Sequence, residues 1–370
     1  MITAQNGPSV HRPPFSIAHL VKTFTQSEKF NRHNNFSPRR CLISSVCESY
    51  NSEQSTAARQ LSLKSVETML PLPQRRPTRQ LTLAIAAVAC LLAAVSFSAQ
   101  APRERTMFVS AVDEKGEPVG GLGPNDFIVR EDGAAREVLR VSRAIEPIDI
   151  AVLVDDSAAS EQLIPRVREA LRPFVARMSD GNQIALVGLA DRPTILANYT
   201  SNPTLLEKGI GLLWPRTRAG STLLDGIFEV SRGLQRRETP RAVIIPVITD
   251  GGDFANRQYD QVIQEVKRAS VAIHAVTVGN FNSTDDEELR NRGRMLAEGT
   301  RVSGGQRVNL LTPMSVQQAF DRLARELLSQ YKVVYGHPES LIPPTKFDVS
   351  ARRPGITMRG APERGTGTSK

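Results

Sequence analysis

The chain has 370 residues, of which 40% are hydrophobic, and a formal net charge of +9. Residues 1–101 carry 11 basic and 4 acidic side chains, whereas the remaining residues carry 36 and 34. The later part is therefore almost neutral, and it has no basic stripe with interleaved aromatic residues, so the sequence argues against a nucleic-acid partner.

The first 101 residues read as two segments that precede the folded protein. Residues 1–68 show no sustained periodicity and are expected to be disordered or not translated. Residues 69–101 combine a short basic start, an apolar run over 81–97 and the small-residue ending Ala99-Gln100-Ala101. This order is typical of an export signal that is cut after Ala101. We therefore expect an exported protein, periplasmic or secreted, without a stable membrane span; a transmembrane anchor over 81–97 is the alternative.

A short β-patterned segment is expected on each side of the central domain. Residues 102–146 alternate in extended runs with turn signals between them, but they are too few for a robust core. Residues 336–370 contain two further strand patterns, over 346–351 and 356–359. We expect both ends to pack together as one small β unit, followed by a frayed tail.

Residues 147–335 alternate between strand and helix patterns, which is the signature of a mainly parallel sheet with helices on both faces. Strands are expected near 148–154, 183–189, 194–199, 242–249, 271–278 and 307–311. A proline, Pro173, lies within the first helical pattern and should bend or shorten that helix. The fold class predicted here is α/β, a Rossmann-like doubly wound sheet with a small flanking β unit.

Two of the predicted strands end in carboxylates. The apolar run 148–154 stops at Asp155 and Asp156, and the run 242–249 stops at Asp250. Between them, Gly220-Ser221-Thr222 opens a helical pattern. Because ligands bind outside the carboxyl ends of strands in open α/β sheets, we expect these side chains at one functional edge.

The order of these residues resembles the von Willebrand factor type A family and its metal-ion-dependent adhesion site. The matching pieces are Asp155-x-Ser157, Gly220-x-Thr222 and Thr249-Asp250-Gly251. The flanking segments are similar to the exported acidobacterial-type branch of that family. The resemblance implies a site for a divalent cation and a partner that is another protein or extracellular macromolecule.

By this resemblance, Asp155, Ser157, Thr222 and Asp250 are the metal residues. The three cysteines all lie within residues 1–101, so a thiolate site is excluded beyond them and the expected ions are Mg, Ca or Mn. The family pattern places a second Ser where this chain has Ala159, which removes one oxygen. The alternative is that the two Asp residues merely cap helices and turns.

The neighbouring residues are given simpler roles. Asp156 is expected to be solvated, with an outer-shell carboxylate at the metal as the alternative. Asp253 is expected at the surface, and Asp225 is expected to support the Thr222 loop. His274 lies in a strand that should be buried on both faces, so it is expected to be a core histidine. Trp214 could form a wall of the site, although a single Trp more often serves packing.

Three functions remain, in order of preference. The first is an exported, non-enzymatic domain for protein–protein interaction or adhesion. The second is a structural or assembly module of the same fold with a non-functional metal site. An enzyme comes third, because only His274 and His337 lie beyond residue 101 and neither has the context of a hydrolase, and no phosphate-binding glycine loop is present.

Overall fold

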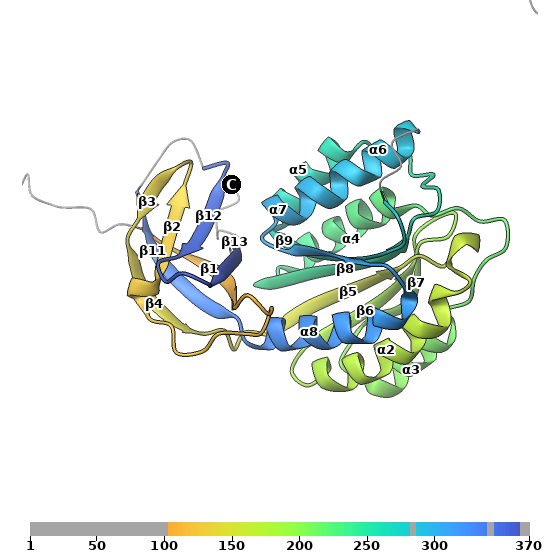
Figure 1. Ribbon diagram of the computed structural model, residues 1–370, viewed down its shortest axis with the longest axis horizontal. Helices are drawn as coiled ribbons and strands as arrows, with labels where there is room; N and C mark the ends of the chain where they lie inside the picture. Colours follow the sequence, from red (N-terminus) through yellow and green to blue (C-terminus); the bar gives the residue numbers. More distant parts are fainter. Residues whose placement is uncertain (1–102, 282–285, 339–343, 363–370) are drawn as a thin grey trace, which may run out of the picture. The chain divides into compact units, whose positions relative to one another are not determined.

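The computed structural model describes residues 103–281, 286–338 and 344–362 (Figure 1). The two expectations for residues 1–101, a disordered or untranslated start and an export signal, lie outside these residues. Within the described ranges, no helix is both long enough and apolar enough to cross a membrane.

A six-stranded sheet forms the centre of the larger part of the structure. Its order is β10-β9-β8-β5-β6-β7, and every neighbouring pair is parallel except β6 and β7. The strands are β5 (Ile148–Val154), β6 (Gln183–Gly188), β7 (Thr194–Thr200), β8 (Arg241–Thr249), β9 (Val271–Val278) and β10 (Gln306–Leu310). The predicted fold class is confirmed: a mainly parallel sheet, wound on both sides, with β7 as an antiparallel edge.

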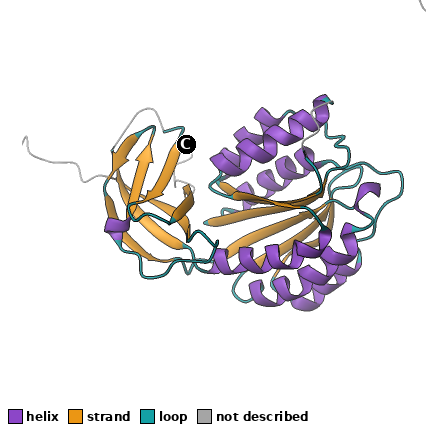
Figure 2. Cartoon of the chain, in the orientation of Figure 1, coloured by secondary structure: helices purple, strands orange, loops and turns teal. Residues whose placement is uncertain are grey.

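Helices cover both faces of this sheet (Figures 1 and 2). One face carries α2 (Leu163–Met178), α3 (Pro203–Gly211) and α8 (Val316–Leu328). The other carries α4 (Leu223–Arg237), α5 (Tyr259–Ala269), α6 (Glu287–Arg294), a π-helical turn at Met295–Gly299 and α7 (Thr300–Val302). The α2 helix continues beyond Pro173 to Met178, so this proline does not end the helix.

The central strand β5 shows why the sheet is buried on both sides. All seven of its residues are buried. Ile150, Val152 and Val154 belong to the core beneath α2 and α8, whereas Ala151 and Leu153 belong to the core beneath α4 and α5. An unbroken apolar run is what such a two-sided environment requires, because successive side chains point to opposite faces.

The flanking β unit consists of two antiparallel sheets around a separate core. The first has the order β13-β1-β11-β4 and the second β12-β2-β3. The strands are β1 (Arg103–Val112), β2 (Phe127–Glu131), β3 (Ala134–Arg136), β4 (Val138–Arg143), β11 (Tyr331–His337), β12 (Phe347–Ala351) and β13 (Thr357–Pro362). Because β1 pairs with β13 and β2 with β12, the expected packing of the two ends is confirmed. Strand β11 also lies wholly in this unit, on both sides of the predicted boundary at residue 335.

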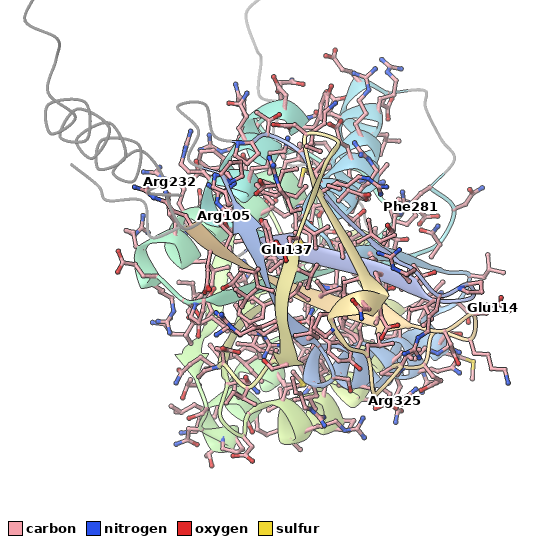
Figure 3. All side chains as sticks on the ribbon, turned by 90° about the vertical axis from the view of Figure 1, so that its left-hand side faces the viewer. Arg105, Glu114, Glu137, Arg232, Phe281 and Arg325 are labelled. Atoms are coloured by element: carbon pink, nitrogen blue, oxygen red, sulfur yellow. The ribbon has the colours of Figure 1, made fainter. Side chains whose placement is uncertain are left out.

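A buried carboxylate organises the interior of the β unit. Glu131 is fully buried, and its Oε2 lies 2.7 Å from His337 Nδ1 and accepts a 2.9 Å hydrogen bond from Arg136 Nε. Its Oε1 accepts a 3.0 Å bond from the Tyr335 hydroxyl and lies 3.6 Å from Arg105, which is labelled in Figure 3. Both oxygens are thus partnered, which is the condition for a buried charge to be tolerated.

Candidate functional site

Asp155 lies at the carboxyl end of β5 and is held rigidly there. It is buried, and its Oδ2 accepts a 2.7 Å hydrogen bond from the Thr249 hydroxyl at the end of the neighbouring strand β8. Its Oδ1 accepts a 3.0 Å bond from the backbone N–H of Ser157. The Thr249 N–H also donates to Oδ2, at 3.3 Å. These three hydrogen bonds fix the orientation of the carboxylate and occupy both lone pairs of Oδ2, so only Oδ1 has one left for another partner.

Thr222 is joined to the same edge through Leu189. The Leu189 N–H donates to the carbonyl of Val154, the last residue of β5, at 3.0 Å. The Leu189 carbonyl accepts bonds from both the N–H and the hydroxyl of Thr222, at 2.9 and 2.7 Å. Thr222 therefore sits beside the end of β5 at the start of α4, with its hydroxyl donating to protein and its oxygen lone pairs unused.

The loop after Asp155 contains Ala159, at the position where the family pattern has a second serine. Ser157 is buried, and its hydroxyl makes no hydrogen bond to any described residue. Ala159 is exposed and lies against Gly251: a Cβ added to that glycine would be only 2.4 Å from the Ala159 methyl. Ser160, the next residue, is buried and its hydroxyl has no hydrogen-bond partner among the described residues. Its side chain therefore does not occupy the exposed position of Ala159.

Asp250 is directed toward the end of β9. Its Oδ2 accepts a 2.8 Å hydrogen bond from the N–H of Asn280. A Cβ at Gly279, which has a φ of +115°, would approach the Asp250 carboxyl to 2.5 Å. Only glycine fits this position comfortably, for both the backbone angle and the space. Asp250 is therefore exposed and tied to the β9 loop, whereas Asp155 is buried at β5.

The expectation that Asp156 is solvated is wrong. Its side chain is fully buried, with Oδ1 accepting a 2.8 Å bond from the N–H of Ala190 and Oδ2 lying 3.3 Å from Arg216 Nε. Burial raises the pKa of Asp156, and the bond from Ala190 and the charge of Arg216 oppose that rise. Gly188 makes room for this carboxylate, because a Cβ there would lie 2.7 Å from it. Asp156 thus links the loops that contain Ala190 and Arg216 to the end of β5.

Asp253 was also expected at the surface, and it is buried as well. Its backbone pairs with Ser221 in an isolated parallel bridge, and its Oδ1 accepts a 3.0 Å bond from Ala255 N–H, but its Oδ2 has no partner. Burial raises the pKa of Asp253 to about 7, with Arg292 opposing the rise and Asp155 adding to it. The sequence holds no signal for this burial, since Ser221 is 32 positions away.

Arg292 on α6 is a residue of this edge that sequence reasoning missed. It is buried, its Nη1 donates to the carbonyl of Gly251, and its Nη2 lies 3.4 Å from the carbonyl of Asp250. Its guanidinium stacks 5.0 Å from the ring of Phe281, a residue labelled in Figure 3. Burial lowers the pKa of Arg292, and the nearby carboxylates, including that of Asp155, oppose this. The guanidinium of Arg292 is therefore a buried positive charge that interacts electrostatically with the carboxylate of Asp155.

The rim of the edge carries exposed aromatic side chains. Phe254 is 68% exposed and lies over Gly220, and its N–H donates to the Ser221 carbonyl at 2.7 Å. Trp214 is 62% exposed and stacks with Arg168 at 4.8 Å, so it does not serve core packing. Exposed rings at the border of a polar centre are a composition that protein interfaces favour.

Asp225 was expected to support the Thr222 loop, but it holds the segment that follows Asp253. Its Oδ2 accepts a 3.0 Å bond from Asn256 N–H, and its Oδ1 lies 3.4 Å from Arg257 Nε. In the described ranges, no three His, Cys, Asp or Glu side chains gather as metal ligands. The candidate donor set consists instead of one carboxylate and two hydroxyls, with Asp250 nearby. Such hard oxygens fit Mg, Ca or Mn, with water completing the coordination.

The comparison with protein families agrees with this architecture. The family model described as the von Willebrand factor type A domain matches residues 149–299. No curated protein matches the chain. Among solved structures, a von Willebrand factor type A protein from Catenulispora acidiphila is 11% identical with a TM-score of 0.41, over 72% of this chain and 74% of that one. The vWF domain of the pili tip protein Mfa5 from Porphyromonas gingivalis is 14% identical with a TM-score of 0.39, over 50% and 96%.

A third solved structure is the mussel byssus protein PTMP1 with a zinc-occupied MIDAS motif. It is 16% identical with a TM-score of 0.40, over 52% of this chain and 50% of that one. The family match covers residues 149–299, less than half of the chain, and this part of the chain, which carries the candidate site, matches the von Willebrand factor type A domain.

Proposed function

We propose that this domain binds another protein at the carboxyl edge of its sheet, through a divalent cation held by Asp155, Ser157 and Thr222. Asp250 would contribute its charge from the β9 side. The partner would supply an acidic side chain to the ion. The chain would act as an exported, non-enzymatic adhesion or interaction module, in keeping with the protein–protein interactions that this domain family mediates.

One observation carries the proposal. Asp155 is buried and oriented by three hydrogen bonds, while the hydroxyl oxygens of Ser157 and Thr222 beside it accept no hydrogen bond from the described residues. Carboxylate and hydroxyl oxygens with free lone pairs are the ligands that hard divalent cations take in proteins. The exposed rings of Phe254 and Trp214 would supply apolar contact around the ion.

Selection of a displayed random peptide library tests this function. The proposal expects peptides with a shared Asp or Glu to be enriched in Mn²⁺ and lost in EDTA. Asp155→Ala should abolish their binding, and Phe254→Ser should weaken it at constant metal affinity. Peptides that bind equally in EDTA and to Asp155→Ala would contradict the proposal.

The second candidate is a structural module of the same fold that does not depend on a metal. Two observations favour it: Ala159 removes an oxygen from the family pattern, and the buried guanidinium of Arg292 already supplies a positive charge near Asp155. On this reading, the variant Asp155→Ala would change stability but no binding event. The same library selection therefore separates the two candidates.

A further inference from the structure

A cavity of about 390 Å³ lies between α4 and the antiparallel edge of the large sheet, where β6 pairs with β7. This volume falls within the range of about 300–1,000 Å³ that is usual for sites of small organic molecules. The apolar part of its lining comes from β6, β7, the turn between them and α4, and consists of Ala185, Val187, Pro193, Ile195, Tyr199 and Val230. None of the candidate metal residues borders the cavity, so it is separate from the metal edge.

A glycine in α4 leaves this space open. Gly233 lines the cavity, and a Cβ added to it would meet no heavy atom of the described residues within 4 Å outside its own helix. Ile195, another lining residue, is 67% exposed, and Val230 is only partly buried. Covering such apolar side chains with an apolar body is favourable, because it removes their surface from water. The cavity is therefore suited to the apolar part of a ligand.

Two arginines with exposed side chains border the same cavity. Arg232, labelled in Figure 3, and Arg236 are four residues apart in α4, so they lie on one face of the helix, a turn apart. Neither forms an ion pair with a carboxylate among the described residues. Arg237 differs from them, because its Nε lies 2.6 Å from Asp149 Oδ2. Arg232 and Arg236 therefore carry the positive charge that is available to a ligand.

The charges of the lining favour an anionic ligand. Two guanidiniums and one carboxylate, that of Glu229, give the lining a net charge of +1. At 1.5 Å of rise per residue, Glu229 lies about 4.5 Å before Arg232 along the helix axis and about 10 Å before Arg236. An anionic group at the Arg236 end is thus close to both positive charges and far from the negative one. A cation would be repelled by the same two arginines.

We propose that this cavity binds a small organic carboxylate with an apolar body. Each carboxylate oxygen would accept a charge-assisted hydrogen bond from one guanidinium, of Arg232 or Arg236, both of which reach into solvent from adjacent turns of α4. The apolar body would lie over Gly233, against Val230 and Ile195. This inference requires no metal ion, so its test in EDTA can fail or succeed independently of the proposed function.

Two probes of nearly equal shape separate the effect of charge from that of apolar contact: 2-naphthoate and its neutral amide, 2-naphthamide. Each is titrated into the full chain in EDTA at low salt, with NMR of the isoleucine and valine methyl groups as the readout. We expect saturable binding of naphthoate, with shifts of the Ile195 and Val230 methyl signals. Naphthamide should bind about threefold to tenfold more weakly, because it forms no ion pair. Raising the salt from about 20 mM to about 500 mM should remove most of this difference, because salt screens exposed charges.

Three variants complete the test. Arg236→Gln removes one positive charge and should weaken naphthoate about threefold while leaving naphthamide unchanged. Arg301→Gln removes an exposed charge outside the cavity and is the matched control, which should bind both probes as wild type does. Gly233→Leu fills the cavity and should abolish the binding of both probes. Its melting temperature should not fall, because leucine favours a helix more than glycine does.

The proposal is overturned if naphthoate shows no saturable binding at millimolar concentration. It is also overturned if naphthamide binds as tightly as naphthoate at low salt, or if Arg236→Gln weakens naphthoate no more than Arg301→Gln does, since the arginines would then have no part in binding. Wild-type affinity in a folded Gly233→Leu protein would place the probe outside this cavity and contradict the proposal as well. If that variant does not fold, the comparison of the two arginine variants still decides.

Discussion

The buried carboxyl of Asp253 should make the stability of this domain fall as the pH rises. Burial raises its pKa to about 7, compared with 3.8 for the free side chain. Between about pH 4 and pH 7, the folded domain keeps a proton that the unfolded chain has already released. The folded state binds more protons, so the unfolding free energy decreases with pH over this interval and levels off above it.

The magnitude follows from the shift of about three pKa units. At 1.36 kcal/mol for each unit, the stability lost between about pH 4 and pH 8 is about 4 kcal/mol. Asp253 is only 3% exposed, so screening by solvent does not reduce this figure much. Asp253→Asn removes the titration and keeps an oxygen for the Ala255 N–H.

Urea unfolding followed by circular dichroism at several pH values, in EDTA, measures the effect. Because other groups also titrate, the quantity to follow is the difference in unfolding free energy between Asp253→Asn and wild type. That difference should shift in favour of the variant by about 4 kcal/mol from about pH 4 to pH 8. Asp348→Asn, at an exposed position, should show no such trend. A difference that is constant with pH, or that shifts toward wild type, would refute the reasoning.

Three further predictions concern single residues. Ala159→Ser should tighten divalent-ion binding severalfold and Asp250→Ala should weaken it, as calorimetry with Mg, Ca and Mn can measure; equal affinities in all three proteins would contradict this. Arg292→Met should raise the affinity for the ion, because it removes a positive charge near the site, whereas the control Arg294→Met should leave it unchanged in the same titration. Glu131→Gln should destabilise the β unit by about 3–5 kcal/mol, because it leaves the charged partners of a buried carboxylate without their counter-charge; hydrogen exchange in β1 and β11 checks this, and unchanged protection there would contradict it.

The central strands of the sheet could be predicted from the sequence because they are long apolar runs. Strand β5 is buried on both faces, and its pattern needs no knowledge of its neighbours. The packing of the two chain ends was also predictable, since each end was too short to fold alone. Strand β11 was not assigned to that unit, because its register with β1 and β4 depends on partners about two hundred positions away.

The candidate site was predictable only where its residues form a local pattern. Asp155 and Ser157 follow the end of β5 and Thr222 precedes α4, so the sequence was enough to predict where they lie in the fold. Asp156 and Asp253 were misplaced, because their burial is produced by loops from other parts of the chain. Asp156 is covered from the Ala190 and Arg216 segments, and Arg292 approaches Asp253 from α6. Neither hydrophobic period nor motif spacing encodes such contacts.

The most direct test of the proposed function is a calorimetric titration of the full chain with Mn²⁺, Mg²⁺ and Ca²⁺, alongside Thr222→Val. We expect one saturable site in the wild type that is lost in the variant, since valine has the shape of threonine without the oxygen. Melting curves in EDTA should show that both proteins are folded. A folded wild-type protein that takes up no ion at millimolar concentration would contradict the metal-dependent function. It would favour the second candidate, a structural module that does not depend on a metal.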